Sequence, residues 1–185
     1  MRPSRIFKSN YHRQEPRDMD YFMIKQSGSI TIPRALTAQE LQAGKLGAET
    51  PEISVRAMTD LSPLDRYDYL ASEHLLSDRL KLLLEQYLPE QNWRPCVFID
   101  QARKLQKVFW FLPPLPYQPE RIDRARNGLP CAVYVAEQDF AMKSPGIFCI
   151  HNHKGPDCVI VHLSIAESML RRGICGLELV RLGDG

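Results

Sequence analysis

The chain has 185 residues, of which 44% are hydrophobic and 25% are charged, and its 24 basic and 22 acidic side chains leave a net charge of +2. A composition this close to the average of globular proteins excludes a disordered chain and predicts a single domain over residues 1–185 with one continuous core. The near-neutral charge, without a long run of like charges, argues against nucleic acid as a direct partner.

Membrane and extracellular locations are not indicated either. No apolar stretch approaches the roughly 20 residues that cross a bilayer, and the N-terminus lacks the apolar segment of a signal peptide. The five cysteines form no CxxC pair, and their odd number indicates neither a disulfide framework nor a zinc knuckle. We therefore expect a cytoplasmic protein that does not bind a membrane.

Short apolar stretches and turn residues alternate in the first half of the chain. Strands are predicted at 21–24 and 30–32, around Ser27-Gly28-Ser29, and at 53–58. Thr37 and Glu40 form a capping box that predicts a short helix. A stronger helix is predicted over 78–88, capped by Ser77 and ended by Pro89. The apolar residues that recur at helical spacing in this second helix are Leu80, Leu83, Leu84 and Tyr87.

Strand-forming residues dominate the second half. A hairpin is predicted from 97–99 and 104–112, followed by strands at 132–136, 146–150 and 159–162. A last helix is predicted to begin at a capping box of Ser164 and Glu167, to bury Ala166, Met169 and Leu170, and to end at Gly173 before a final strand. These elements predict an α+β fold, a mainly antiparallel sheet with a few short helices packed on it.

One sequence feature argues for a metal site. Cys149, His151 and His153 fall at alternate positions of a strand and so share a face, and Cys158 and His162 lie on the returning strand. No carboxylate is evident to orient the ligands beyond Asp157. We therefore expect exposed histidines beside buried cysteines and no metal or other cofactor. A cysteine nucleophile is disfavoured for the same residues because they lie among apolar neighbours.

Four segments of the chain resemble a known family. They are 77–87 (SDRLKLLLEQY), 144–150 (SPGIFCI), 159–164 (VIVHLS) and 170–179 (LRRGICGLEL). Together, over about residues 70–182, they resemble a bacterial immunity-protein family long catalogued as a domain of unknown function, whose members occur beside polymorphic or secreted toxin genes. The resemblance implies an inhibitor that is held in the producer's cytoplasm, and it carries no catalytic residue onto this chain.

The residues by themselves also favour a binding protein over an enzyme, because no phosphate-binding, hydrolase or zinc-protease motif occurs. We therefore expect an immunity protein that inhibits a toxin domain by direct contact, and a homo-oligomer is compatible with this expectation. The alternative is an uncharacterised enzyme or a metal-binding protein that uses the Cys149, His151 and His153 hairpin.

The contact surface is predicted from a stiff loop. Four prolines in residues 113–119 hold this loop rigid, which lowers the entropy cost of binding. Tyr117 is the preferred anchor, and Leu115 lies beside it in the sequence. The acidic residues predicted to complement a basic toxin cleft are Asp60, Asp65 and Asp68.

Overall fold

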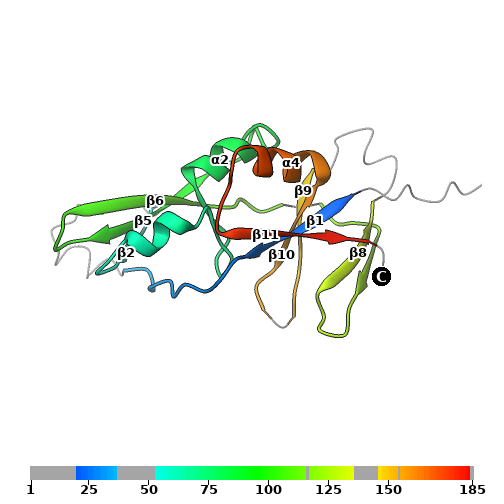
Figure 1. Cartoon of the computed structure of the whole chain (residues 1–185), viewed down its shortest axis with the longest axis horizontal. Helices are drawn as coiled ribbons and strands as arrows, with labels where there is room; N and C mark the ends of the chain where they lie inside the picture. The colour runs from blue at the N-terminus through cyan, green and yellow to red at the C-terminus, as the bar shows by residue number, and fades with distance from the viewer. Residues whose placement is uncertain (1–19, 37–52, 116, 136–145, 154, 184–185) are drawn as a thin grey trace, which may run out of the picture.

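Strands dominate the fold, which is α+β as expected (Figure 1). The computed structural model describes residues 20–36, 53–115, 117–135, 146–153 and 155–183. Within them lie a four-stranded sheet, a five-stranded sheet, a two-stranded hairpin and two α-helices. The helix predicted from Thr37 and Glu40 lies outside the described residues.

The four-stranded sheet has the order β11-β1-β10-β9, and every neighbouring pair is antiparallel. Its strands are β1 (Tyr21–Gln26), β9 (Ile147–Ile150), β10 (Cys158–His162) and β11 (Leu177–Leu182). Because successive side chains of a strand point to opposite faces, neighbouring residues enter different hydrophobic clusters. On β1, Ile24 packs toward the helices, whereas Met23 packs toward the opposite face. The sheet is therefore buried on both faces.

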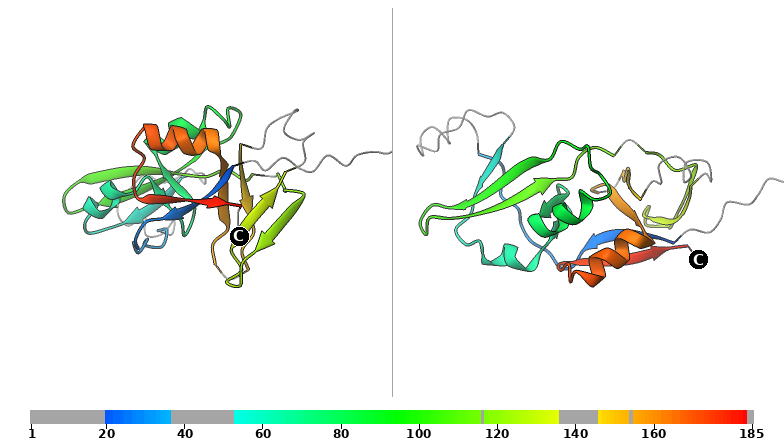
Figure 2. Two further views of the ribbon diagram at one scale, coloured as in Figure 1. Left: turned by 45° about the vertical axis from the view of Figure 1, so that its right-hand side comes forward. Right: turned by 90° about the horizontal axis from the view of Figure 1, so that it is seen from above.

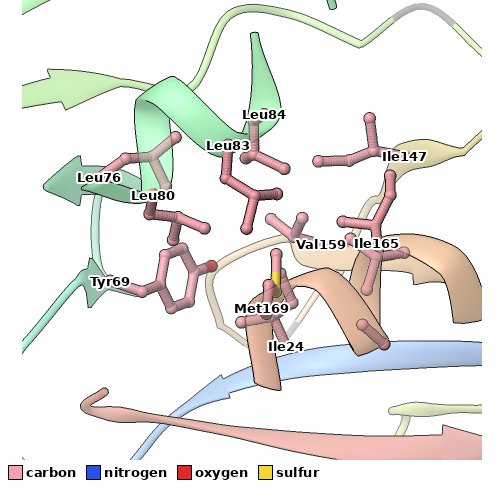
Figure 3. Packing of buried hydrophobic residues seen from close by; sticks show 12 residues of the cluster. Ile24, Tyr69, Leu76, Leu80, Leu83, Leu84, Ile147, Val159, Ile165 and Met169 are labelled. Atoms are coloured by element: carbon pink, nitrogen blue, oxygen red, sulfur yellow. The ribbon is translucent and has the colours of Figure 1, made fainter. Parts of the chain in front are cut away.

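Helices α2 (Asp78–Leu84) and α4 (Leu163–Arg171) lie side by side over one face of this sheet (Figures 1 and 2). Figure 3 shows their side chains meeting those of the strands. The buried members of this cluster, the helix-side core, are Ile24, Tyr69, Leu76, Leu80, Leu83, Leu84, Ile147, Val159, Val161, Ile165, Ala166 and Met169. Each large apolar side chain buried in this way contributes about 1.5–3 kcal/mol, so the helix-side core is a main source of stability.

The opposite face of the same sheet is covered by a hairpin of β7 (Arg121–Arg124) and β8 (Pro130–Tyr134). Ile122 and Val133 of this hairpin pack against the sheet. The buried members of this cluster, the hairpin-side core, are Tyr21, Met23, Val135, Phe148, Ile150, Cys158, Ile160 and Leu182. The sequence predicted β8 and did not predict β7, whose four residues include three charged ones.

The five-stranded sheet has the order β2-β5-β6-β4-β3. Its strands are β2 (Ser54–Ala57), β3 (Tyr69–Leu70), β4 (Leu75–Ser77), β5 (Arg94–Asp100) and β6 (Leu105–Phe111). The β5–β6 hairpin confirms the prediction, and the parallel pairing of β2 with β5 is the exception to an otherwise antiparallel arrangement of the described strands. A short 3-10 helix, η1 (Ser62–Arg66), connects β2 to β3.

The strand predicted at 30–32 is wrong. Gly28 has a φ of +79°, and the backbone from 29 to 36 forms no regular element. Ile30 and Ile32 instead pack against the core of the five-stranded sheet. Strand β1 pairs with β10 and β11, so both of its edges are already occupied.

The helix limits also differ from the sequence prediction. Ser77 caps α2 as expected, because its side chain accepts from the Leu80 amide, but the helix ends at Leu84. Helix α4 begins at Leu163, one residue early, because His162 Nδ1 accepts from the Ser164 amide and takes the capping role. The side chain of Glu167 pairs forward with Arg171 instead of reaching back.

The buried face of α4 is also shifted relative to the prediction. Leu170 is 70% exposed, whereas Ala166 and Met169 are buried as predicted. Ile165, which the sequence prediction omitted, is the third buried residue. None of the helices in the described part of the chain combines the length and apolar character needed to cross a membrane.

Two glycines after α4 give a matched test of the connection to β11. Gly173 and Gly176 have φ values of +61° and +71°, so a side chain at either position is strained by about 1–2 kcal/mol. A Cβ on Gly176 would also lie 2.5 Å from the carbonyl oxygen of Arg66, whereas at Gly173 the nearest atom is 3.9 Å away. We expect Gly176→Ala to lower the free energy of unfolding clearly more than Gly173→Ala. Urea denaturation of both variants measures the difference, and equal losses would contradict this close approach.

Two partly buried histidines, His74 and His162, should make the free energy of unfolding fall in acid. Burial lowers the pKa of His74 and outweighs the raising effect of Asp157. The ring of His74 is hydrogen-bonded to the Tyr69 hydroxyl over 2.7 Å. Burial also lowers the pKa of His162, because it outweighs the raising effect of Asp20. The folded state thus favours neutral imidazoles. Their contribution is present above the unfolded pKa of about 6.5 and is lost as pH falls through the lower folded values.

The corresponding variant is His162→Asn, because asparagine caps a helix without titrating in this range. We expect it to reduce the loss of unfolding free energy between about pH 7.5 and about pH 5. Urea denaturation at both pH values measures this loss. The same loss in the variant and in the unmodified chain would show that His162 does not contribute to it.

Candidate functional site

Two of the three predicted acidic residues lie together at an open hollow. Asp60 precedes η1, and its Oδ1 accepts from the Ser62 amide (3.0 Å) and the Ser62 hydroxyl (2.8 Å), which fixes the start of η1. Asp65 lies on η1 with a side chain that is 74% exposed. The hollow has a volume of about 370 Å³, and its lining comes from two parts of the chain: Asp60, Leu61, Ser62 and Asp65 on one side, and Arg103, Leu105, Gln106 and Lys107 on the other.

The second side of the hollow is held by the turn between β5 and β6. Asp100 is 1% exposed, and its Oδ1 accepts from the Arg103 amide over 3.1 Å, which closes the turn. Its Oδ2 lies 3.2 Å from Nη1 of Arg103, so the same carboxylate also orients the guanidinium. Lys104 completes the turn with a φ of +55°. These contacts present Arg103 and Lys107 from an ordered scaffold.

Each acid of the hollow faces a base. Arg103 Nη1 lies 3.5 Å from Asp60 Oδ1, and Lys107 Nζ lies 2.5 Å from Asp65 Oδ1. The hydrogen bonds from Ser62 are the main cause that lowers the pKa of Asp60. The hollow therefore carries paired charges, and the two predicted acids in it, Asp60 and Asp65, each have a basic partner within the chain.

Such exposed ion pairs each contribute only about 0–1 kcal/mol, so they exchange at low cost for pairs with another molecule. Leu105 lies among them and is 54% exposed, which adds an apolar contact. The hollow thus combines exchangeable ion pairs with an exposed apolar side chain.

Asp68, the third predicted acid, lies inside the protein at 4% exposure. Its carboxylate accepts hydrogen bonds from the Ser77 hydroxyl, from the Cys175 amide (2.8 Å) and from the Cys175 thiol (3.3 Å), and Arg79 Nη1 lies 3.6 Å away. These contacts join the start of α2 to the segment before β11. Asp68 is therefore a structural residue, and we exclude it from the binding surface.

The described residues of the proline-rich loop, 113–115 and 117–119, are irregular, as the prolines predict, and the two predicted contact residues are half-buried. Leu115 packs against the helix-side core, and Tyr117 packs against the hairpin-side core. The Tyr117 ring centre lies 5.3 Å from that of Phe148 in an edge-to-face arrangement. Tyr117 thus anchors the loop to the protein itself, and the structure does not place it at the Asp60 and Asp65 hollow.

The predicted metal hairpin separates into two environments. Cys149 is half-buried against the helix-side core, and burial is the main cause that raises its pKa to about 12. Cys158 packs on the other face of the sheet, in the hairpin-side core. His151 and His153 are exposed, as predicted. Across the described part of the chain, no group of three or more histidine, cysteine, aspartate or glutamate side chains is placed to hold a metal ion.

The basic half of the hollow has no recognisable signal in the sequence. The sequence predicts a hairpin around Arg103 and Lys107, but nothing in their spacing indicates that η1 packs beside them. Only the pairing of β2 with β5 places the segment that follows β2 at this end of the five-stranded sheet. Comparison with known proteins adds no further assignment, because no family model and no curated protein matches the chain.

The contrast between Asp68 and Asp65 is testable by stability. Asp68→Ala leaves the Ser77 hydroxyl and the Cys175 amide without their acceptor, and each unsatisfied buried donor costs about 1–3 kcal/mol. We expect this variant to lose several kcal/mol of unfolding free energy. Asp65→Ala is the matched control and should lose no more than about 1 kcal/mol. Urea denaturation distinguishes them, and similar losses would contradict the structural role of Asp68.

Proposed function

We propose that this chain is an immunity protein that neutralises a bacterial toxin by binding it directly in the producer's cytoplasm. The observation that carries the proposal is the hollow between η1 and β6, where an exposed apolar residue, Leu105, is surrounded by exchangeable charges. The resemblance of residues 70–182 to an immunity-protein family supports the same role. The chain acts in this proposal as an inhibitor without catalytic chemistry of its own.

The hollow suits a partner that is already folded. The Asp60 carboxylate is held by Ser62 of η1, and the backbone at Arg103 is held by the β5–β6 turn, so only the side chains that change partners are reordered on binding. Asp60 and Asp65 can accept hydrogen bonds from basic residues of a toxin once Arg103 and Lys107 have paired with acidic residues of the same toxin. This exchange favours a partner surface that carries both signs of charge.

Co-expression with the toxin domain encoded beside this gene tests the role. We expect growth to be rescued and a one-to-one complex to be isolated. Growth rescue without any complex would exclude direct inhibition.

Charge reversal tests the site. The double variant Asp60→Arg and Asp65→Arg should raise the Kd for the toxin at least about tenfold, because it places four basic side chains in the hollow. The matched control is Glu120→Arg with Glu178→Arg, which reverses two exposed acids on other strands or their flanks and should leave the Kd within about threefold. Calorimetry measures both values, and an unchanged Kd in the first variant would move the interface away from the hollow.

Tyr117→Ala separates the loop from the hollow. Because the Tyr117 ring packs on Phe148, we expect this variant to lower the thermal stability of the chain and to leave its Kd for the toxin close to that of the unmodified chain. A large loss of affinity at unchanged stability would instead restore Tyr117 as the contact residue.

A further inference from the structure

A second arrangement of polar groups lies at the tips of two hairpins, away from the hollow. The turn between β9 and β10 lies beside the turn between β7 and β8, and both extend from the four-stranded sheet toward the lower edge of Figure 1 (Figures 1 and 2). Arg124 joins them, because its Nη1 donates to the carbonyl of Gly128 (2.8 Å) and its Nη2 donates to the carbonyl of His151 (2.9 Å). Arg124 therefore ties the backbone of His151 to the β7–β8 turn.

The imidazole of His151 is oriented by a carboxylate. Its Nδ1 lies 2.8 Å from Oδ1 of Asp157, and the same oxygen accepts from the Asn152 amide over 3.1 Å. A neutral histidine that donates through Nδ1 keeps its lone pair on Nε2. The side chain is 69% exposed, so this lone pair is accessible. Metal-binding histidines are typically held by a carboxylate in this way.

His153 lies directly beside His151. Their ring centres are 4.8 Å apart and their planes are nearly perpendicular, at 87°. Two imidazoles that bind one tetrahedral ion, at about 2.0–2.1 Å each, have ring centres roughly 5 Å apart. The observed spacing of the ring centres is therefore compatible with two imidazoles bound to one ion.

We propose that His151 and His153 form a two-histidine site for a first-row divalent cation of the zinc class, with Asp157 orienting His151. The sequence offers no orienting carboxylate beyond Asp157, and the hydrogen bond from His151 to Asp157 shows that this carboxylate does orient a histidine. Cys149 takes no part, because it is packed in the helix-side core. Two of the four tetrahedral positions are left for water or for donors from another molecule.

This site differs from a structural zinc site. Both histidines are exposed, and neither belongs to the helix-side core or to the hairpin-side core. We therefore expect the chain to fold without the ion, which adds a local charge at the β9–β10 turn. The proposal does not depend on the proposed immunity function.

The test uses the full chain after treatment with a chelator, titrated with zinc chloride in a calorimeter. We expect one ion per chain, at least about a tenfold loss of affinity in His151→Ala and in His153→Ala, and a 10–100-fold loss in Asp157→Asn. The amide introduced by the last variant would still offer an oxygen to the backbone N–H of Asn152, so the turn is preserved. His12→Ala removes a histidine at another place in the sequence and should bind as the unmodified chain does.

A spectroscopic measurement adds the number of ligands. Copper bound to the unmodified chain should show hyperfine coupling to two imidazole nitrogens in electron paramagnetic resonance, and to one in each single histidine variant. Circular dichroism of every variant verifies that the fold is retained. The proposal is overturned if zinc does not bind, or if binding persists unchanged when both histidines are replaced.

Discussion

The carboxylate of Asp68 joins the two sheets through hydrogen bonds. It belongs to the segment between η1 and β3, and it accepts from the amide of Cys175, which precedes β11. The Asp68 amide donates in return to the Cys175 carbonyl over 2.9 Å, and the Ser77 hydroxyl that caps α2 is bound by the same carboxylate. Gly176 must be a glycine because Arg66 and Tyr67 pass against it. A buried charge is costly unless its partners are all in place, so this junction fixes the two sheets in one arrangement.

Hydrophobic cores cover both faces of the four-stranded sheet. Residues of one parity along each strand enter the helix-side core, and those of the other parity enter the hairpin-side core. A shift of one residue in register would exchange the two sets, so the two cores hold the register jointly. The proline-rich loop contributes to both cores through Leu115 and Tyr117. The stiff loop therefore contributes to the stability of the fold through these two side chains.

The two candidate binding surfaces lie at separate places in the fold. The hollow is at the turn of the β5–β6 hairpin, and the histidine pair is in the β9–β10 turn, which Arg124 joins to the β7–β8 hairpin. Figure 1 shows the β5–β6 and β9–β10 turns at separate places in the fold. In both places a buried or half-buried aspartate orients an exposed basic side chain: Asp100 holds Arg103, and Asp157 holds His151. Turns closed by an aspartate are rigid platforms, which favours recognition over motion.

Local elements whose signals are short in range could be predicted from the sequence alone. The capping by Ser77, the helical spacing of Leu80, Leu83 and Leu84, and the β5–β6 hairpin follow from neighbouring residues, and all three are present. Tertiary contacts were needed to establish the burial of Asp68, the pairing of Asp60 and Asp65 with Arg103 and Lys107, and the separation of Cys149 from His151. Each of these depends on segments that are distant along the chain, and an acid has the same local pattern whether it lies in a core or on a surface.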